Sequence, residues 1–252
     1  MRLRLGQPWS LRLGQLAYLP QIIRGHEETR RAFAEEPVIE RLAGNREPLE
    51  GVGAEMSERV VEIPWVIRRL PASPGARILD IGTAFSPVVY KRLLIRQPQS
   101  IDVADLAPAF VPGLTSHVAD VRDLPFPDDT FDVAICLSTL EHIGMDNAQY
   151  DVQSGGEGDV QALRELGRVA RRVLVTVPAG VETDMGWQRQ YSPDAFRRVV
   201  EAAGLSVLEL DLFAHDAVRG WAPADEDAVA QRTYGQGAIA AAANICAELT
   251  RQ

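Results

Sequence analysis

Three aspartates follow short apolar runs of the sequence, at positions where a carboxylate could bind a ligand. Asp80 ends RILD, Asp105 ends IDVAD and Asp120 follows HVA. A carboxylate at the tip of a second parallel strand can accept hydrogen bonds from both hydroxyls of a ribose, which we expect of Asp105. Asp120 is placed to accept from an adenine amine, and the next N–H, that of Val121, could reach a ring nitrogen. A turn or helix-cap aspartate is the alternative explanation.

A glycine and a histidine complete the set of residues that could take part in binding or catalysis. Gly82 lies in RILDIGTAFS, where a tight turn with small residues leads into a helix expected over 87–95. Small residues allow a ligand to approach the backbone, although many such turns are only connections. His142 follows an apolar run at 131–137, and imidazole titrates near neutral pH. It is therefore the candidate general base, with a histidine that only holds the loop as the alternative.

The elements that must position these residues alternate along the chain after a turn-rich break, PASPG, at residues 71–75. Short β-branched or apolar runs are separated by segments long enough for helices, which predicts βαβ units and a parallel sheet. Two later runs could add a terminal antiparallel pair. The expected strands are 77–81, 100–105, 117–119, 131–137 and 173–177, followed by 205–213 and roughly 240–249.

The segment before the break is predicted to be helical, so we expect a helical arm or cap over 1–74 and a second domain over 75–252. Residues 55–70 are expected to form a helix, in which Ser57 caps the start and Pro64 kinks or splits it. Residues 1–31 carry six arginines and two glutamates. They form either a helix packed on the core or a surface for an anionic or membrane-associated substrate.

Composition narrows the function classes. The net charge is −9 and the pI about 5.0, which argues against a surface that grips a phosphate backbone. Cys136 and Cys246 lie in apolar runs, which favours two buried small residues over a disulfide or a metal site. No apolar stretch reaches the ~18 residues of a membrane span. We therefore expect no transmembrane segment and a cytoplasmic location.

Four ordered pieces of the chain resemble the class I S-adenosylmethionine (SAM)-dependent methyltransferases, in the branch with an LPF–FD–LEH pattern. The pieces are LDIGTAFS, VADLAP, ADVRDLPFPDDTFDVAICLSTLEHI and ALRELGRVARRVLVTVP. A weaker fifth piece, YSPDAFRRVVEAAGLSVLEL, resembles the family's helix and sixth strand. The resemblance implies an α/β, doubly wound, mostly parallel, seven-stranded Rossmann-like sheet with an added N-terminal helical segment. It also implies SAM as the cofactor and methyl transfer as the activity.

The resemblance assigns the cofactor contacts residue by residue. One departure is that Ala84 and Ser86 occupy positions where the family usually has glycine, which puts loop shape and affinity in doubt. The implied contacts are Asp80, Gly82, Thr83 and Ala84 at the methionine end, Asp105 at the ribose, Leu106, Asp120 and Val121 at the adenine, and Leu137 and Ser138 below the sulfonium.

Substrate contacts are expected from Tyr150, Trp187 and Tyr191, although each could instead be a packing residue. The fourth strand is followed by LSTL rather than the Asn/Asp-Pro-Pro-aromatic motif of enzymes that methylate nucleobase or glutamine nitrogens. The absence of this motif argues against a nucleic acid substrate. It favours a small polar acceptor, such as a hydroxyl of a sugar or secondary metabolite. Glu141, His142 and Asp146 lack a convincing metal-ligand set, so we expect no metal.

Two other functions stay open. A nicotinamide-dependent Rossmann oxidoreductase would also use a glycine turn and a second-strand acid, but it does not account for LPFPDDTFDV or STLEH. A catalytically silent methyltransferase-like binding module would account for the missing loop glycines. The sequence does not specify the oligomeric state.

Overall fold

The computed structural model describes residues 34–45, 48–146, 155–237 and 240–252. Contacts divide the chain into two units, Met1–Ala34 and Glu35–Gln252, and the second carries the fold. The surface predicted for residues 1–31 and the substrate contact predicted for Tyr150 lie outside the described residues. Among the described helices, none is both long and apolar enough to cross a membrane.

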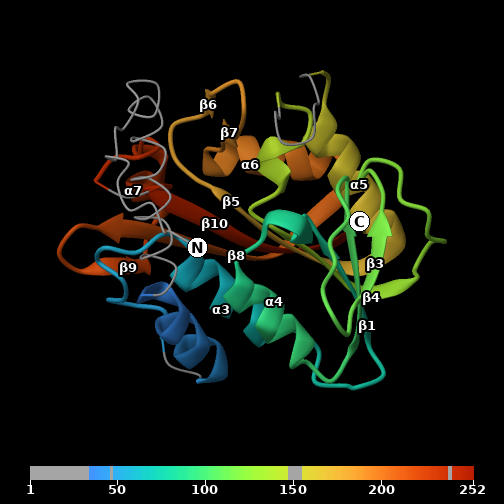
Figure 1. Cartoon of the computed structure of the whole chain (residues 1–252). Coiled ribbons are helices and arrows are strands. Elements are labelled where there is room, and N and C mark those ends of the chain that lie inside the picture. The colour runs from blue at the N-terminus through green and yellow to red at the C-terminus, as the bar shows by residue number, and fades with distance from the viewer. Residues whose placement is uncertain (1–33, 46–47, 147–154, 238–239) are drawn as a thin grey trace, which may run out of the picture. The chain divides into compact units, whose positions relative to one another are not determined.

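The core of the second unit is an eight-stranded sheet in the order β3-β2-β1-β4-β5-β10-β8-β9 (Figure 1). The first five strands in this order are parallel, and β10, β8 and β9 are added antiparallel. The strands are β1 (Arg77–Ile81), β2 (Ser100–Asp105), β3 (Thr115–Val118), β4 (Phe131–Leu137), β5 (Ala170–Pro178), β8 (Leu205–Asp216), β9 (Gly220–Pro223) and β10 (Ala243–Arg251).

This topology confirms the predicted doubly wound α/β sheet and its terminal antiparallel pair. The eighth strand is β9, a hairpin partner of β8 in which Trp221 lies opposite His215. Trp221 enters the core, where it is fully buried, and its indole N–H donates to the Met56 carbonyl oxygen at 3.0 Å.

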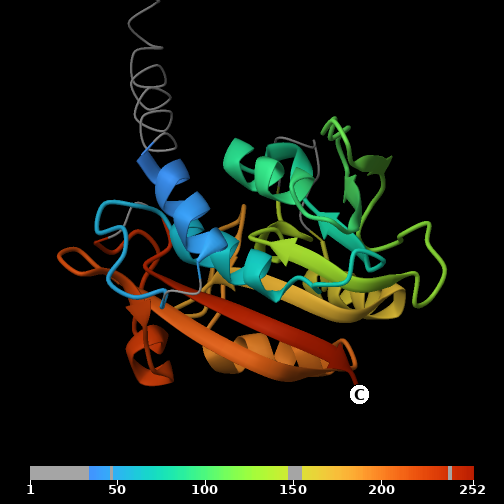
Figure 2. The same cartoon turned by 90° about the horizontal axis from the view of Figure 1, so that it is seen from below.

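Helices cover both faces of the sheet, as Figure 2 shows. One face carries α3 (Arg59–Arg69) and α4 (Val88–Ile95), and the other carries α5 (Gly158–Val169) and α6 (Pro193–Ala202). The central strand β4 is buried on both faces, so its sequence FDVAICL is almost continuously apolar. Cys136 and Cys246 are buried free thiols, as predicted.

Helix α3 corrects two details of the sequence prediction. It runs from Arg59 to Arg69 without a break at Pro64, so the predicted split is wrong. Ser57 does not cap it, because the Ser57 hydroxyl donates instead to Glu35 at 3.0 Å. Glu35 belongs to a helix over residues 34–44. Both helices belong to the same compact unit as the sheet, and the domain boundary near residue 74 stays a prediction.

Candidate functional site

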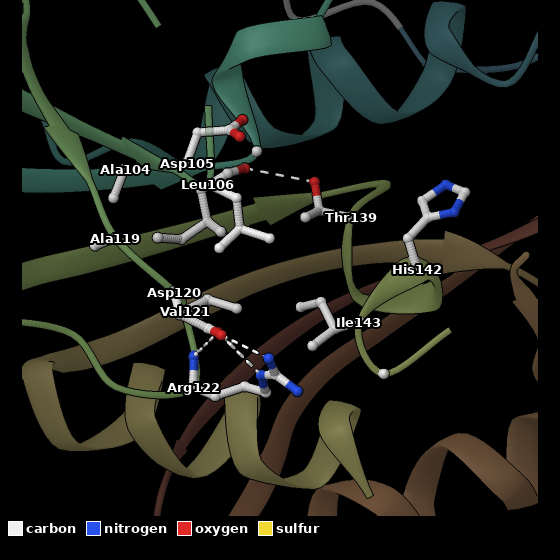
Figure 3. Close-up of a pocket in the computed structure, with 13 residues that line it drawn as sticks. Ala104, Asp105, Leu106, Ala119, Asp120, Val121, Arg122, Thr139, His142 and Ile143 are labelled. Atoms are coloured by element: carbon white, nitrogen blue, oxygen red, sulfur yellow. Dashed lines mark hydrogen bonds and ion pairs between the residues drawn. The ribbon is translucent and has the colours of Figure 1, made fainter. Parts of the chain in front are cut away.

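A pocket opens at the carboxyl ends of β1, β2 and β4, where parallel α/β sheets place their ligands (Figure 3). It is open to solvent, and its cavity volume of about 80 Å³ is below the range of about 300–1,000 Å³ typical of small-molecule sites. Its walls are largely apolar, with a few polar groups. The lining residues are Ile81, Gly82, Ala104, Asp105, Leu106, Ala119, Asp120, Val121, Arg122, Thr139, His142, Ile143 and Gly144.

Asp105 reaches this pocket from the last position of β2 and is only 4% exposed. Its carboxylate accepts the N–H of Ala84 at 2.9 Å and the N–H of Ala107 at 3.0 Å. These bonds fix the carboxylate and also tie the loop after β1 to the end of β2. A carboxylate has about four lone-pair sites, so it can accept several hydrogen bonds at once.

Asp120 lines the pocket two residues beyond the end of β3, paired with Arg122. The guanidinium donates to it at 2.6 Å, and the Arg122 N–H adds a bond at 2.9 Å (Figure 3). The hydrogen bonds from Arg122 lower the pKa of Asp120, so the carboxylate is charged at neutral pH. Among the described residues, no hydrogen bond occupies the adjacent N–H of Val121. An anionic acceptor and an available donor thus stand side by side.

Gly82 forms the turn after β1 with φ of +82°, a conformation that favours glycine. A Cβ at this position would lie 2.3 Å from the Thr139 hydroxyl oxygen. Thr139 follows β4, and its hydroxyl donates to the Leu137 carbonyl at 3.0 Å. The absence of a side chain on Gly82 therefore lets the loops after β1 and β4 meet closely at the pocket floor.

Asp80 and Thr83 lie beneath this loop rather than in the pocket wall. Asp80 is fully buried and accepts hydrogen bonds from the hydroxyls of Thr83 and Tyr90. Burial raises the pKa of Asp80 to about 7, against the lowering effect of these two donors. The carboxyl group therefore braces the turn from inside. Ala84 contributes through its backbone, and it does not line the pocket.

Leu137 and Ser138 lie at the end of β4, next to the pocket-lining Thr139, and neither lines the pocket itself. Ser138 has a positive φ of 42°, which is uncommon for a residue other than glycine. Its hydroxyl donates to the buried Glu62 of α3 at 2.9 Å. Helix α3, which precedes the predicted cofactor-binding domain, thus helps to hold the strand end.

His142 lies in a short helical turn, η2 (Leu140–His142), away from Asp120 and Arg122 in the view of Figure 3. Its ring stacks on Trp187 with centroids 5.6 Å apart, and Nδ1 lies 3.0 Å from the Trp187 carbonyl oxygen. A carbonyl only accepts, so the proton is on Nδ1 and Nε2 is the acceptor. Burial lowers the pKa of His142, which keeps the ring neutral. These contacts make the ring an anchor for the loop that carries Trp187.

The structure places the other two predicted substrate residues in different surroundings. Trp187 is 47% exposed beside His142, where a ligand could reach it. Tyr191 is 3% exposed in the main core, and its hydroxyl donates to Asp159 at 3.0 Å. It is a packing residue. In the part of the chain that the structure describes, no three His, Cys, Asp or Glu side chains gather as a metal site would require.

Residues 93–173 match the family described as a methyltransferase domain. The match spans β2, β3 and β4, the strands that carry Asp105, Asp120 and the LEH turn. This part of the chain is therefore similar to a methyltransferase domain. A comparison with curated protein sequences finds no significant match.

Solved structures share the fold of this chain. The YcgJ protein of Bacillus subtilis is 15% identical, with a TM-score of 0.50, over 76% of this chain and 98% of that one. A protein of Bacillus halodurans described as a putative methyltransferase is 12% identical, with a TM-score of 0.50, over 75% and 98%. The 1,6-didemethyltoxoflavin-N1-methyltransferase of Burkholderia thailandensis, solved with S-adenosylhomocysteine (SAH), is 12% identical, with a TM-score of 0.48, over 100% and 93%.

The residues of the pocket fit the family's cofactor. Apolar walls suit a flat purine, Asp105 is placed for hydroxyls, and Asp120 with the Val121 N–H offers the acceptor and donor that adenine requires. Sequence reasoning missed Thr139, Arg122 and Glu62. Of these, Glu62 could have been noticed in the sequence, because it is the only charged residue in the otherwise apolar run VVEIPWVI.

Proposed function

We propose that this methyltransferase transfers the methyl group of SAM to a small polar molecule. The observation that carries the proposal is the single pocket in which Gly82, Asp105 and Asp120 converge at the carboxyl edge of the sheet. In this proposal Asp105 holds the ribose, Leu106 packs on the adenine, and Asp120 and the Val121 N–H bind its edge. Bound there, SAM supplies an electrophilic methyl group on a sulfonium.

The chain's own part in the reaction is to bind, orient and exclude water. Gly82 lets the cofactor approach the backbone, while Asp80 braces the turn from beneath. The Ala84 N–H, held by Asp105, keeps the loop closed against β2 without the usual later glycines. Ser138, fixed by Glu62, sets the direction in which β4 leads into the η2 turn. The acceptor is then positioned by groups on the η2 side of the pocket.

The acceptor expected from sequence is a small polar molecule such as a sugar or secondary metabolite with a nucleophilic hydroxyl. The acidic chain and the mixed, largely apolar pocket support a small molecule over a nucleic acid. The proposal includes the expected cytoplasmic location, which two free thiols support.

The proposal is tested by incubating the purified full chain with methyl-labelled SAM and a panel of sugars, phenols, alcohols and amines. We expect label to move into at least one acceptor, with formation of SAH, and both products to fall in Asp105→Asn. If the chain binds SAM but no acceptor takes up label, the domain is a silent binding module and the proposal is wrong.

A further inference from the structure

A buried acidic cluster lies next to the pocket, on the side of η2. We define it as Glu58 and Glu62 of α3 together with Glu141 of η2, with Arg59 as its one cation among the described residues. The three carboxyl side chains are 8%, 0% and 2% exposed, respectively. Burying a carboxyl group is costly unless it is paired, so the question is what each of them binds.

Glu62 is fully engaged within the protein. It accepts hydrogen bonds from Ser138 Oγ at 2.9 Å, Thr176 Oγ1 at 2.9 Å and Asn244 Nδ2 at 3.1 Å. It also forms the ion pair with Arg59. The single arginine of the cluster is therefore balanced by Glu62, which holds α3 to the ends of β4, β5 and β10.

Glu141 is not engaged in this way. Its Oε2 is buried and has no hydrogen-bond partner among the described residues. Its Oε1 lies 3.9 Å from His142 Nε2, too far for a hydrogen bond. Glu58 accepts only a long bond, 3.4 Å, from the Ala241 N–H, and no ion pair of the described residues includes it. Two buried carboxyl groups thus form no ion pair among the described residues, although the charge of Arg59 acts on both.

The surroundings explain how these acids persist without an ion pair. Burial, followed by the charges of Glu62 and Glu58, raises the pKa of Glu141 to about 8, while a hydrogen bond from its own backbone N–H and the charge of Arg59 lower it. Burial likewise raises the pKa of Glu58 to about 7. Other titratable groups also act on this site. They are His142 on the same turn, Cys136 of β4, Tyr191 after β7 (Arg189–Gln190) and Tyr234 after α7 (Glu226–Ala230).

Aromatic rings border the same place. Trp187 stacks on His142 and meets Tyr234 edge to face, with centroids 6.1 Å apart. Burial raises the pKa of Tyr234, and the charges of Glu58 and Glu141 raise it further. Acids without an ion pair, close in sequence to the exposed ring stack of Trp187 on His142, suit a ligand with a cationic head and an apolar body.

We propose that Glu141 and Glu58 bind the amino group of an amine acceptor and that Glu141 takes its proton. This inference rests on the proposed function and narrows its acceptor from a hydroxyl to an amine. The ammonium group gives one proton to the Glu141 carboxylate and becomes a free amine. The nitrogen lone pair then forms the N–CH₃ bond while the S–CH₃ bond breaks. The sulfur keeps that electron pair as a neutral thioether, and the positive charge passes to the nitrogen.

Oε2 of Glu141 is the atom that receives the proton, because it is buried and has no hydrogen-bond partner among the described residues. His142 is a poorer proton acceptor, since burial lowers its pKa and its ring is anchored to the Trp187 loop. In this proposal Glu141 therefore takes the role of general base that the sequence analysis expected of His142.

The test uses calorimetry on the full chain saturated with SAH. The probes are two matched pairs, phenethylamine with phenethyl alcohol and tryptamine with tryptophol, at pH 7 and pH 8.5. We expect each amine to bind more tightly than its alcohol, and more tightly at pH 8.5, where Glu141 has lost its proton. Glu141→Gln should weaken amine binding by about 10-fold or more, as expected for a lost charge-assisted hydrogen bond, and abolish the pH effect.

Glu201→Gln, an exposed glutamate of α6, is the matched control and should bind amines as the wild type does. Melting temperatures and SAH affinity establish that Glu141→Gln is folded and retains the cofactor site. If SAH binds but the amines do not outbind the alcohols, or Glu141→Gln binds amines as well as the wild type, the inference is overturned and the proposed function stands. If SAH does not bind, the proposed function fails first.

Discussion

The Ser138 hydroxyl donates a 2.9 Å hydrogen bond to the Glu62 carboxylate, joining the end of β4 to a helix that precedes the sheet in sequence. Ser138 has a positive φ, and its N–H donates to the Thr176 carbonyl at 3.0 Å. The Thr176 hydroxyl also donates to Glu62, at 2.9 Å. One buried carboxylate therefore sets the shape of the strand end from which the η2 turn and its acid depart.

Glu62→Ala should be strongly destabilising. It leaves Arg59 without its buried partner and removes the acceptor shared by three side chains, so we expect a loss of ~3–5 kcal/mol in the free energy of unfolding. Urea denaturation followed by circular dichroism measures this. Glu201→Ala, on the exposed side of α6, should stay within ~0.5 kcal/mol of the wild type. Equal effects of the two substitutions would contradict the role given to Glu62.

Gly82→Ala should cost more than the backbone conformation alone explains. Gly82 and Gly204 have similar φ values, +82° and +76°, but a Cβ on Gly82 would meet Thr139 whereas one on Gly204 meets no atom within 4 Å. Gly204→Ala should lose ~1–2 kcal/mol for its left-handed backbone, and Gly82→Ala at least ~1 kcal/mol more for overpacking. Urea unfolding of both variants compares them, and similar losses would mean that Thr139 moves aside freely.

The fold was largely predictable because its information is local. β-Branched and apolar runs bounded by turns located six of the seven expected strands, and the buried strand β4 is the clearest of them. The last strand, near 240–249, was expected from the family resemblance, because its alanines favour a helix. The hairpin strand β9 was not predicted, since its four residues, GWAP, form no run of strand-forming residues. Ser57 was misassigned for a similar reason. Its hydroxyl serves Glu35, a partner 22 residues away that local cap patterns do not include.

The candidate site was predictable in part. Gly82, Asp105, Leu106, Asp120, Val121 and His142 line one pocket, as the ordered motifs implied. Glu62 and Glu58 could not be found in this way, because they come from a helix outside the motifs and reach the site only through tertiary packing. Tyr191 lies after β5, where a substrate contact was expected, but its side chain is buried in the core.

The stability of the protein should depend on pH through Glu141. The folded protein keeps its proton up to about pH 8, whereas the unfolded chain releases it near pH 4.5. This contribution to stability is fully present below pH 4.5 and is lost as the pH rises through about 8. Glutamine does not titrate, so the stability of the wild type relative to Glu141→Gln should fall between pH 5 and pH 8.5.

Urea unfolding of both proteins across this range gives that difference. Taking the difference removes the opposite contribution of His142, whose lowered pKa makes stability rise with pH near its titration. A difference that is constant with pH would mean that Glu141 is ionised throughout, and that the cluster does not hold its proton.

Asp105→Asn should weaken cofactor binding without unfolding the chain. The amide keeps the shape of the side chain but loses the charge and one acceptor, which we expect to cost ~1.5–3 kcal/mol, or roughly 10–100-fold in SAH affinity. Asp227→Asn, in the exposed part of α7 (Glu226–Ala230), is the control and should bind SAH as the wild type does. Calorimetry of both variants decides this, and an unchanged affinity in Asp105→Asn would remove Asp105 from the site.

The most direct test of the central claim is calorimetry of the wild-type chain with SAM, SAH and NAD. We predict that SAM and SAH each bind at a single site per chain and that NAD does not bind. Binding of NAD without binding of SAM or SAH would contradict a methyltransferase site and assign the pocket to a nicotinamide-dependent enzyme.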